Sequence, residues 1–248
     1  MGWNLFSVPL ELTWKFDKAD ERYSELLVTQ FRNVYDNDAT PKPRYYQIPE
    51  SIEKVGTVYA DSETQTINEL GASYTKKYKY LRPGTYNYNT KNNMPMLRLA
   101  DIILCKAEIL NELNGPTQEA VDLINQIRSR AFQDDAHNLS LASYSSKEAL
   151  RDAICDERLL ELNNEGVRRL DLIRMGLWKD RLNKYIAAIK LKSEWRQKNS
   201  KDPNADYTSE WKVYPQDLTD NDIRRYFPVP KRELDLNPDL ANCRSFSK

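Results

Sequence analysis

A long apolar helix, followed closely by a second helix within residues 94–131, most constrains how this chain can fold. Between Met96 and Leu113 apolar side chains surround most of the expected helix, which is typical of a helix buried on all sides. Gly115 can take a positive φ beyond a helix C-terminus, and Thr117 is a suitable N-cap for the next helix. That second helix has one apolar face, formed by Ala120, Val121, Ile124, Ile127 and Ala131. The pattern predicts a helical hairpin of tetratricopeptide-like size.

Further helices are expected after the hairpin. Ser145 and Glu148 have the spacing of a capping box, in which a hydroxyl and a carboxylate satisfy free N–H groups at a helix start. This third helix is expected to end near Gly166, and a short fourth helix to end at Gly176. A fifth, amphipathic helix is expected around residues 182–189. The sequence therefore predicts a mainly α fold, with extended loops and a few short strands covering the helices.

The region before the hairpin is rich in aromatic residues and prolines and poor in helix signals. Leu10–Phe16 and Glu25–Tyr35 alternate partly between apolar and polar residues, which favours short strands. Asp17–Tyr23 is expected to be a charged turn, and Ser73–Tyr80 another short strand. We expect a single domain over residues 1–248, made of four regions: 1–93 (aromatic-rich loops and strands), 94–178 (helical core), 179–225 (helix and surface insertion) and 226–248 (extended tail).

Composition excludes several classes of function. Thirty-seven basic and thirty-seven acidic residues give a net charge of zero, which does not favour nucleic-acid or anionic-membrane binding. No apolar run reaches the ~18 residues of a membrane-spanning helix, and the first residues lack a signal-peptide pattern. Cys105, Cys155 and Cys243 are too scattered for a disulfide framework or a zinc site, and His137 lies in a polar segment. We therefore expect no metal and no cofactor.

Carboxylates recur at helical spacing at Glu157, Glu161 and Glu165. A glycoside hydrolase needs two carboxyl groups roughly 5–10 Å apart, and neighbours at this spacing could approach that distance. Nearby arginines favour a structural network of ion pairs instead, with Arg98 and Asp101 pairing on their own helix. We predict no catalytic residue. The expected network consists of Arg98, Asp101, Glu157, Arg158, Glu161, Glu165, Arg168, Asp171 and Arg174.

Four stretches, in this order, carry family-specific motifs: Met96–Leu104 with Ala107 and Glu108, Ile124–Ala131 after Ala120, Ile154–Arg174, and Tyr226–Asn242. Together they resemble the C-terminal portion of the SusD/RagB family of nutrient-uptake outer-membrane lipoproteins. Family members are longer and begin with a signal peptide and a lipidated cysteine, so the chain is expected to be a C-terminal part. The resemblance implies non-catalytic capture of an extracellular glycan or similar nutrient. It also implies delivery to a SusC-like TonB-dependent transporter at the extracellular face of the outer membrane.

Aromatic residues outside the helices are the best candidates for ligand contact. A sugar ring stacks its apolar face on an aromatic plane while neighbouring polar groups bind its hydroxyls. The segments at residues 44–46 and 86–89 combine both features best. With two tryptophans expected outside the helices, they supply the predicted ligand-binding residues: Trp3, Trp14, Arg44, Tyr45, Tyr46, Tyr86, Asn87 and Tyr88. The family resemblance itself assigns no positions. Two alternatives remain open, a tetratricopeptide-like scaffold for protein–protein interaction and, less favoured, a carbohydrate-active enzyme.

Overall fold

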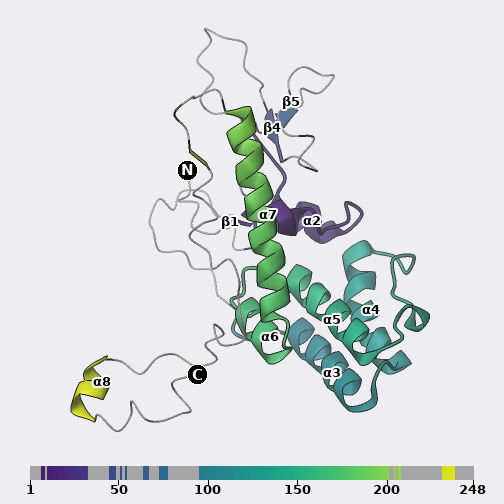
Figure 1. Cartoon of the computed structure of the whole chain (residues 1–248). Coiled ribbons are helices and arrows are strands. Elements are labelled where there is room, and N and C mark those ends of the chain that lie inside the picture. Colours follow the sequence, from purple (N-terminus) through teal and green to yellow (C-terminus); the bar gives the residue numbers. More distant parts are fainter. Residues whose placement is uncertain are drawn as a thin grey trace, which may run out of the picture. The chain divides into compact units, whose positions relative to one another are not determined.

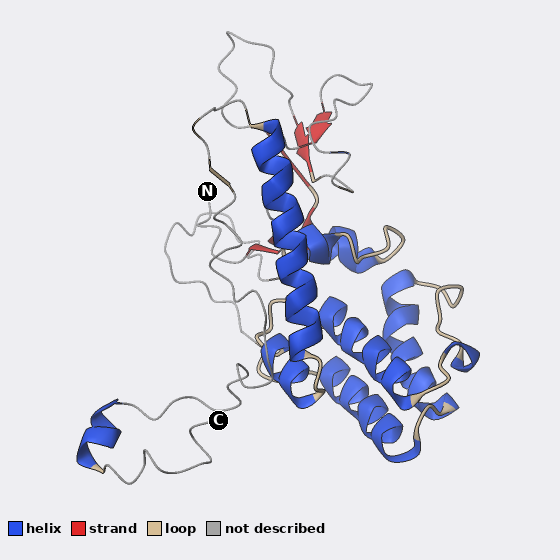
Figure 2. Ribbon diagram, in the orientation of Figure 1, coloured by secondary structure: helices blue, strands red, loops and turns tan. Residues whose placement is uncertain are grey.

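The structure is a computed structural model of residues 1–248. It describes residues 7–8, 10–32, 45–48, 51, 54, 64–66, 73–77, 95–200, 204, 206–207 and 231–237. The chain divides into two compact units, Met1–Arg168 and Arg169–Lys248, and the boundary falls within the predicted helical core 94–178. Helices dominate and the strands are few and short (Figure 2), which confirms the mainly α prediction.

Three helices form the centre of the first unit: α3 (Leu99–Asn114), α4 (Gln118–Phe132) and α5 (Lys147–Glu161). They lie side by side (Figure 1), and α3 packs against both α4 and α5. Gly115 ends α3 with a φ of 77°, and its N–H donates to the Asn111 carbonyl. Thr117 caps α4 by accepting a hydrogen bond from the Ala120 N–H. The predicted hairpin and both of its turn residues are therefore confirmed.

The core between these helices follows their helical spacing. Apolar residues recur every three or four positions on the facing sides, and burial of each large one stabilises the fold by roughly 1.5–3 kcal/mol. The fully or nearly fully buried side chains are Leu104, Ala107, Val121, Ile124, Leu150 and Ile154. Asn111, also fully buried, joins α3 to the start of α5 through a bond from its Nδ2 to the Lys147 carbonyl.

The prediction that α3 is buried on all sides is wrong. Ala100, Leu104 and Ala107 face the core, whereas Leu99 and Leu113 are largely exposed. An apolar pattern all round a helix shows that every face can be buried. It does not show that the same chain supplies the cover.

The third helix also starts and ends at other residues than expected. Ser146, not Ser145, is the N-cap of α5, and its Oγ accepts a 3.1 Å hydrogen bond from the Ala149 N–H. A short 3₁₀ turn, η2 (Leu141–Ser143), precedes it. The helix ends at Glu161, and a turn with positive φ at Asn164 and Gly166 leads onward. Gly166 therefore belongs to the turn after the helix and is not its immediate end.

Short elements precede the helical core: β1 (Ser7–Val8), α1 (Leu10–Thr13), α2 (Glu21–Leu26), β2 (Leu27–Val28), β3 (Gln30–Arg32), β4 (Tyr45–Gln47), β5 (Thr64–Thr66) and β6 (Ser73–Thr75). Strand β6 pairs antiparallel with both β1 and β2 in one sheet. In the other sheet β4 pairs antiparallel with β3 and parallel with β5. The predicted strands in Glu25–Tyr35 and Ser73–Tyr80 are confirmed as short pieces.

Of two other predictions for this region, one is wrong and the other is confirmed only in part. Leu10–Phe16 begins as helix α1 instead of a strand, since a four-residue apolar pattern does not distinguish the two. The expected turn at Asp17–Tyr23 is confirmed at its start, where the Asp20 N–H donates to the Asp17 carbonyl at 3.1 Å. From Glu21 onward the chain is helix α2 instead, because Asp20 accepts a hydrogen bond from the Arg22 N–H as an N-cap. Val8, Phe16 and Leu27 form a small core, against which Leu12, Tyr23 and Leu160 pack.

The second unit contains most of α6 (Arg168–Arg174), together with α7 (Trp178–Asn199) and α8 (Lys231–Leu236). Gly176, with a φ of 73°, follows α6 as predicted. Helix α7 is much longer than the expected segment around 182–189. Helix α8 corrects the prediction of an extended tail, since Lys, Arg, Glu and Leu in this stretch are good helix formers. No helix in the described part of the chain has the length and apolarity to cross a membrane.

Candidate functional site

The first unit contains a buried network of guanidinium and carboxylate groups centred on α5. Glu157 and Glu161 lie one turn apart on the same face of this helix, and Glu165 follows in the turn after it. Their side chains are only 3%, 4% and 6% exposed. Charged groups this deeply buried need partners, and the structure supplies them from segments before the helix.

Glu157 is held by two arginines from different elements. The Arg22 Nη1 donates to Glu157 Oε1 at 2.7 Å, and the Arg128 Nη1 donates to Oε2 at 3.0 Å. Arg22 is also paired with Asp20, the N-cap of α2, at 2.7 Å. Burial opposes the charge on Arg22, but the bonds with Asp20 and Glu157 outweigh it, so the pKa of this guanidinium is raised. The pairs attach α2 to α5 across the unit.

Glu161 accepts hydrogen bonds from three arginines. Arg98 Nη1 and Arg130 Nη2 each donate to Oε1 at 2.6 Å, and Arg22 Nη1 donates to Oε2 at 3.1 Å. Burial alone would raise the pKa of this carboxyl group. The hydrogen bonds and positive charges of Arg130 and Arg98 outweigh burial and lower its pKa to about 2.

Glu165 completes the network on the C-terminal side of α5. The Arg98 Nε lies 2.9 Å from both of its carboxylate oxygens, and the Lys77 Nζ forms a further ion pair with it. Lys77 also donates to the carbonyls of Glu161 and Asn163, at 2.8 and 3.2 Å. Burial lowers the pKa of Lys77, and the bond with Glu165 offsets part of this effect. These contacts fix the chain just after β6 against the end of α5.

The predicted pairing of Arg98 with Asp101 is replaced by pairs between helices. Arg98 binds the two glutamates described above, while Asp101 pairs with Arg158 of α5 at 2.7 Å. The same Arg158 Nη1 lies 3.3 Å from the Cys105 Sγ. Neighbours at i, i+3 on one helix interact only weakly, so a buried partner on another helix prevails.

For three further residues of the expected network, the structure gives other contacts. Arg168 donates to the carbonyl and the Sγ of Cys155, at 2.9 and 3.0 Å. Asp171 and Arg174, in the second unit, pair with each other at 2.8 Å along α6. Arg168 thus bonds to backbone and sulfur within the first unit.

Arg22, Lys77, Arg128 and Arg130, together with Asp20, take part in the network although the sequence did not single them out. Arg128 and Arg130 lie two positions apart in α4, within a stretch recognised for its family motif. For Arg22 and Lys77 the sequence gives no signal of the bonds to α5, because these partners are more than 80 residues away.

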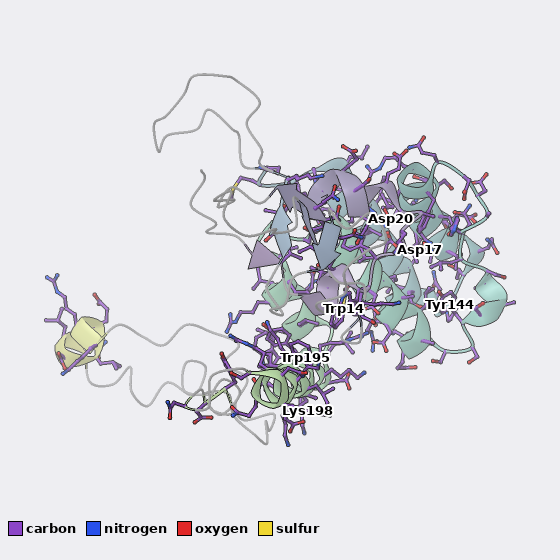
Figure 3. All side chains as sticks on the ribbon, turned by 90° about the horizontal axis from the view of Figure 1, so that it is seen from above. Trp14, Asp17, Asp20, Tyr144, Trp195 and Lys198 are labelled. Atoms are coloured by element: carbon purple, nitrogen blue, oxygen red, sulfur yellow. The ribbon has the colours of Figure 1, made fainter. Side chains whose placement is uncertain are left out.

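The predicted ligand-binding residues are described only in part. Trp14, in the turn after α1, has a half-buried side chain. Figure 3 labels it, together with Asp17 and Asp20 of the segment that follows. The structure places the backbone of Tyr45 and Tyr46 in the central strand β4. The other predicted ligand residues lie outside the described part: Trp3, Arg44, Tyr86, Asn87 and Tyr88.

The network has the chemistry of a structural clamp. A general acid for glycoside hydrolysis needs a raised pKa, whereas Glu161 is held ionised by its arginines. Within the described ranges, no group of three or more His, Cys, Asp or Glu side chains is arranged to hold a metal ion. The described charged cluster therefore holds together segments that are far apart along the chain.

Comparisons with known proteins agree on one family. The sequence model of the SusD family matches residues 10–244. Two curated relatives come from Formosa agariphila. SusD-like protein P38 is 32% identical over 204 residues (66% of this chain and 39% of that protein), and SusD-like protein P25 is 43% identical over 93 residues (38% and 17%). The crystal structure of a SusD homolog from Bacteroides thetaiotaomicron has the same fold, with a TM-score of 0.57 and 23% identity. The structural match covers 91% of this chain and 41% of the chain of the homolog. The chain thus spans less than half the length of these relatives.

Proposed function

Because the chain belongs to the SusD family, we propose that it is part of a nutrient-binding protein of a bacterial outer membrane. The family match over residues 10–244 is the observation that carries this proposal. The fold shared with the SusD homolog and the similarity to curated relatives named SusD-like also support this proposal.

The ligand that we propose is an extracellular oligosaccharide or a similar small nutrient. Aromatic side chains would stack on sugar rings, and adjacent amide or guanidinium groups would bind the hydroxyls. The proposed contacts remain those expected from the sequence: Trp3, Trp14, Arg44, Tyr45, Tyr46, Tyr86, Asn87 and Tyr88. Among them Trp14 has a described side chain, and the exposed Asp17 three residues later offers a polar partner for a hydroxyl.

The proposed role is capture without catalysis. Hydrolysis of a glycosidic bond needs one carboxyl group that is protonated near neutral pH and a second that is ionised. The carboxylates of α5 bind arginines, and the pKa of Glu161 is lowered to about 2. This arrangement supports a binding protein over a glycoside hydrolase.

The partner that we propose is a SusC-like TonB-dependent transporter, to which the captured nutrient is handed over at the extracellular face of the outer membrane. We propose that a lipid anchor holds the protein there, located in the part of the longer relatives that this chain does not span. Family membership alone supports this partner and this location.

A glycan array followed by calorimetric titration of the best oligosaccharide tests the binding role, with a reducing-end assay in parallel. We expect Trp14→Ala to weaken binding about tenfold, since an aromatic stacking contact contributes on the order of 1 kcal/mol. Trp195→Ala, which changes a half-buried tryptophan of α7 that is not among the proposed ligand contacts, is the matched control and should leave the affinity unchanged. Release of new reducing ends by the purified chain would contradict a non-catalytic role. Equal affinity of both variants would exclude Trp14 from the site.

A further inference from the structure

One face of α3 carries apolar side chains that face outward from the first unit. Leu99, Ile102, Ile109 and Leu113 are 74%, 50%, 57% and 76% exposed. In the segment just before the helix, Met96 and Leu97 are 92% and 65% exposed. Exposed apolar residues on other helices of the described part, such as Leu170 and Leu191, do not form such a run. A contiguous apolar surface of this kind marks an interaction site, whereas scattered residues do not.

The spacing of this surface is that of a helix seam. Leu99, Ile102, Lys106, Ile109 and Leu113 alternate by three and four positions over two heptads, which is the a/d pattern of packed helices. The opposite face of α3 already packs on α4 and α5 through Leu104 and Ala107. The outer seam therefore has the form required to receive one more helix.

We propose that the outer seam of α3 is the docking surface for an amphipathic helix from the part of the SusD-like fold that this chain does not span. The SusD homolog of known structure is long enough to supply it, since this chain covers only 41% of it. The curated relatives likewise extend well beyond the matched region. Cover from that part completes the burial of α3 that the apolar pattern of the helix requires.

The charge at the centre of the seam disfavours a second copy of this chain as the occupant. Lys106 occupies the middle position between Leu99 and Leu113 and pairs with Glu119 of α4 at 2.9 Å. Two seams packed antiparallel about a two-fold axis would bring two Lys106 ammonium groups together, which is repulsive. A helix with an acidic or neutral polar residue at that position, between apolar neighbours, fits the seam better.

A chimera tests this assignment directly. In it, the chain replaces the structurally matching segment of the SusD homolog from Bacteroides thetaiotaomicron, and it is compared with the chain alone by hydroxyl-radical footprinting and thermal unfolding. We expect the oxidation of Met96 to fall several-fold in the chimera while that of Leu191 stays the same. The double substitution Ile102→Glu/Ile109→Glu should lower the Tm of the chimera by at least about 5 °C but that of the chain alone by less than about 2 °C. Leu191→Glu is the matched control and should act equally in both.

Three outcomes would overturn the proposal. The first is equal oxidation of Met96 in both proteins, and the second is the same small Tm shift from the double substitution in both. The third is a dimer of the chain alone in light scattering that the double substitution converts to a monomer, which would assign the seam to a second copy. If the chimera does not fold, the unmatched part of the homolog is added to the chain as a separate polypeptide. Protection of Met96 then supports the proposal, and lack of protection contradicts it.

Discussion

Helices α3 and α5 pack against each other, yet they depart from the usual distribution of side chains in opposite ways. Helix α5 buries charged groups, with Glu157, Arg158 and Glu161 each about 3% exposed, whereas α3 exposes large apolar groups such as Ile102 and Leu113. Each buried charge of α5 has a partner supplied by the first unit itself. The described part of that unit offers no such cover for the outer seam of α3. The comparison shows that the exposure of a side chain depends on which packing partners are present as well as on whether the side chain is polar or apolar.

The buried charges of α5 and the exposed apolar residues of α3 also differ in how much their removal changes the stability of the chain. A buried ion pair gains little net stability because desolvation offsets the attraction, but loss of one partner leaves an uncompensated charge and is strongly destabilising. An exposed apolar side chain stays in contact with water and therefore stabilises the fold little, so its removal should change the free energy of unfolding of the chain alone only slightly. The first three of the following predictions test this difference, and the fourth concerns the start of α5.

The largest effect is expected from Glu161→Ala on α5. This change removes a buried carboxylate shared by Arg98, Arg130 and Arg22, whose side chains are 26%, 55% and 7% exposed. We expect the free energy of unfolding in urea to fall by about 3–5 kcal/mol. Glu112→Ala is the control, since Glu112 pairs with Arg151 at 35% exposure, where ion pairs contribute roughly 0–1 kcal/mol. An equal loss in the free energy of unfolding for the two variants would contradict the expectation that the buried ion pairs of Glu161 matter more than the more exposed pair of Glu112.

The two faces of α3 can be compared by the same substitution in the same helix. Leu104→Ala opens a cavity at a fully buried site and should lower the free energy of unfolding by about 2–5 kcal/mol. Leu113→Ala, at 76% exposure, should change it by less than about 0.5 kcal/mol in the chain alone. Chemical denaturation of both variants measures the contrast. A large loss for Leu113→Ala would show that the outer seam is already covered.

Acid should weaken the clamp on α5 gradually. The pKa of Glu161 is lowered from an ordinary value of 4.5 to about 2, so its contribution is fully present above pH 4.5 and is lost as the pH falls toward 2. The shift corresponds to about 3 kcal/mol of stability across this window. Urea titrations at several pH values should show this slope, and Glu161→Gln should remove most of it. An unchanged slope in that variant would assign the acid sensitivity to other groups.

The smallest effect concerns where α5 begins. Ser146→Ala removes the hydroxyl that accepts the Ala149 N–H and should cost about 1 kcal/mol. Ser145→Ala, one position earlier, is the control and should have almost no effect. Thermal unfolding of the pair distinguishes the two candidate caps. A larger loss of stability for Ser145→Ala than for Ser146→Ala would show that Ser145, as first predicted, is the N-cap.

The elements predicted correctly from the sequence are those with local causes. The hairpin turn at Gly115 and the cap at Thr117 depend on a few adjacent residues, and both were predicted. The strand predicted at Leu10–Phe16 was wrong because so short a pattern is compatible with helix α1 as well as with a strand. The cap at Ser146 was missed by one residue because two adjacent serines present the same chemistry.

The network could be predicted only in outline. The spacing of Glu157, Glu161 and Glu165 indicated one acidic helix face, and the nearby arginines indicated ion pairs. The identity of the partners depends on the tertiary fold, which places Arg22 against α5 and joins Asp101 to Arg158 in place of Arg98. Most of the proposed ligand-binding residues lie outside the described part of the chain, and no motif in the sequence distinguishes a stacking aromatic from a packing one.

The bond between Arg22 and Glu157 also has a consequence for the order in which the chain folds. It joins residues 135 positions apart, whereas α3, α4 and α5 follow one another along the chain. Contacts between sequence neighbours form faster than contacts that close long loops. We therefore expect the three helices to assemble first and α2 to attach to them afterwards. During synthesis from the N-terminus, Arg22 leaves the ribosome long before Glu157 and Glu161 exist to receive it.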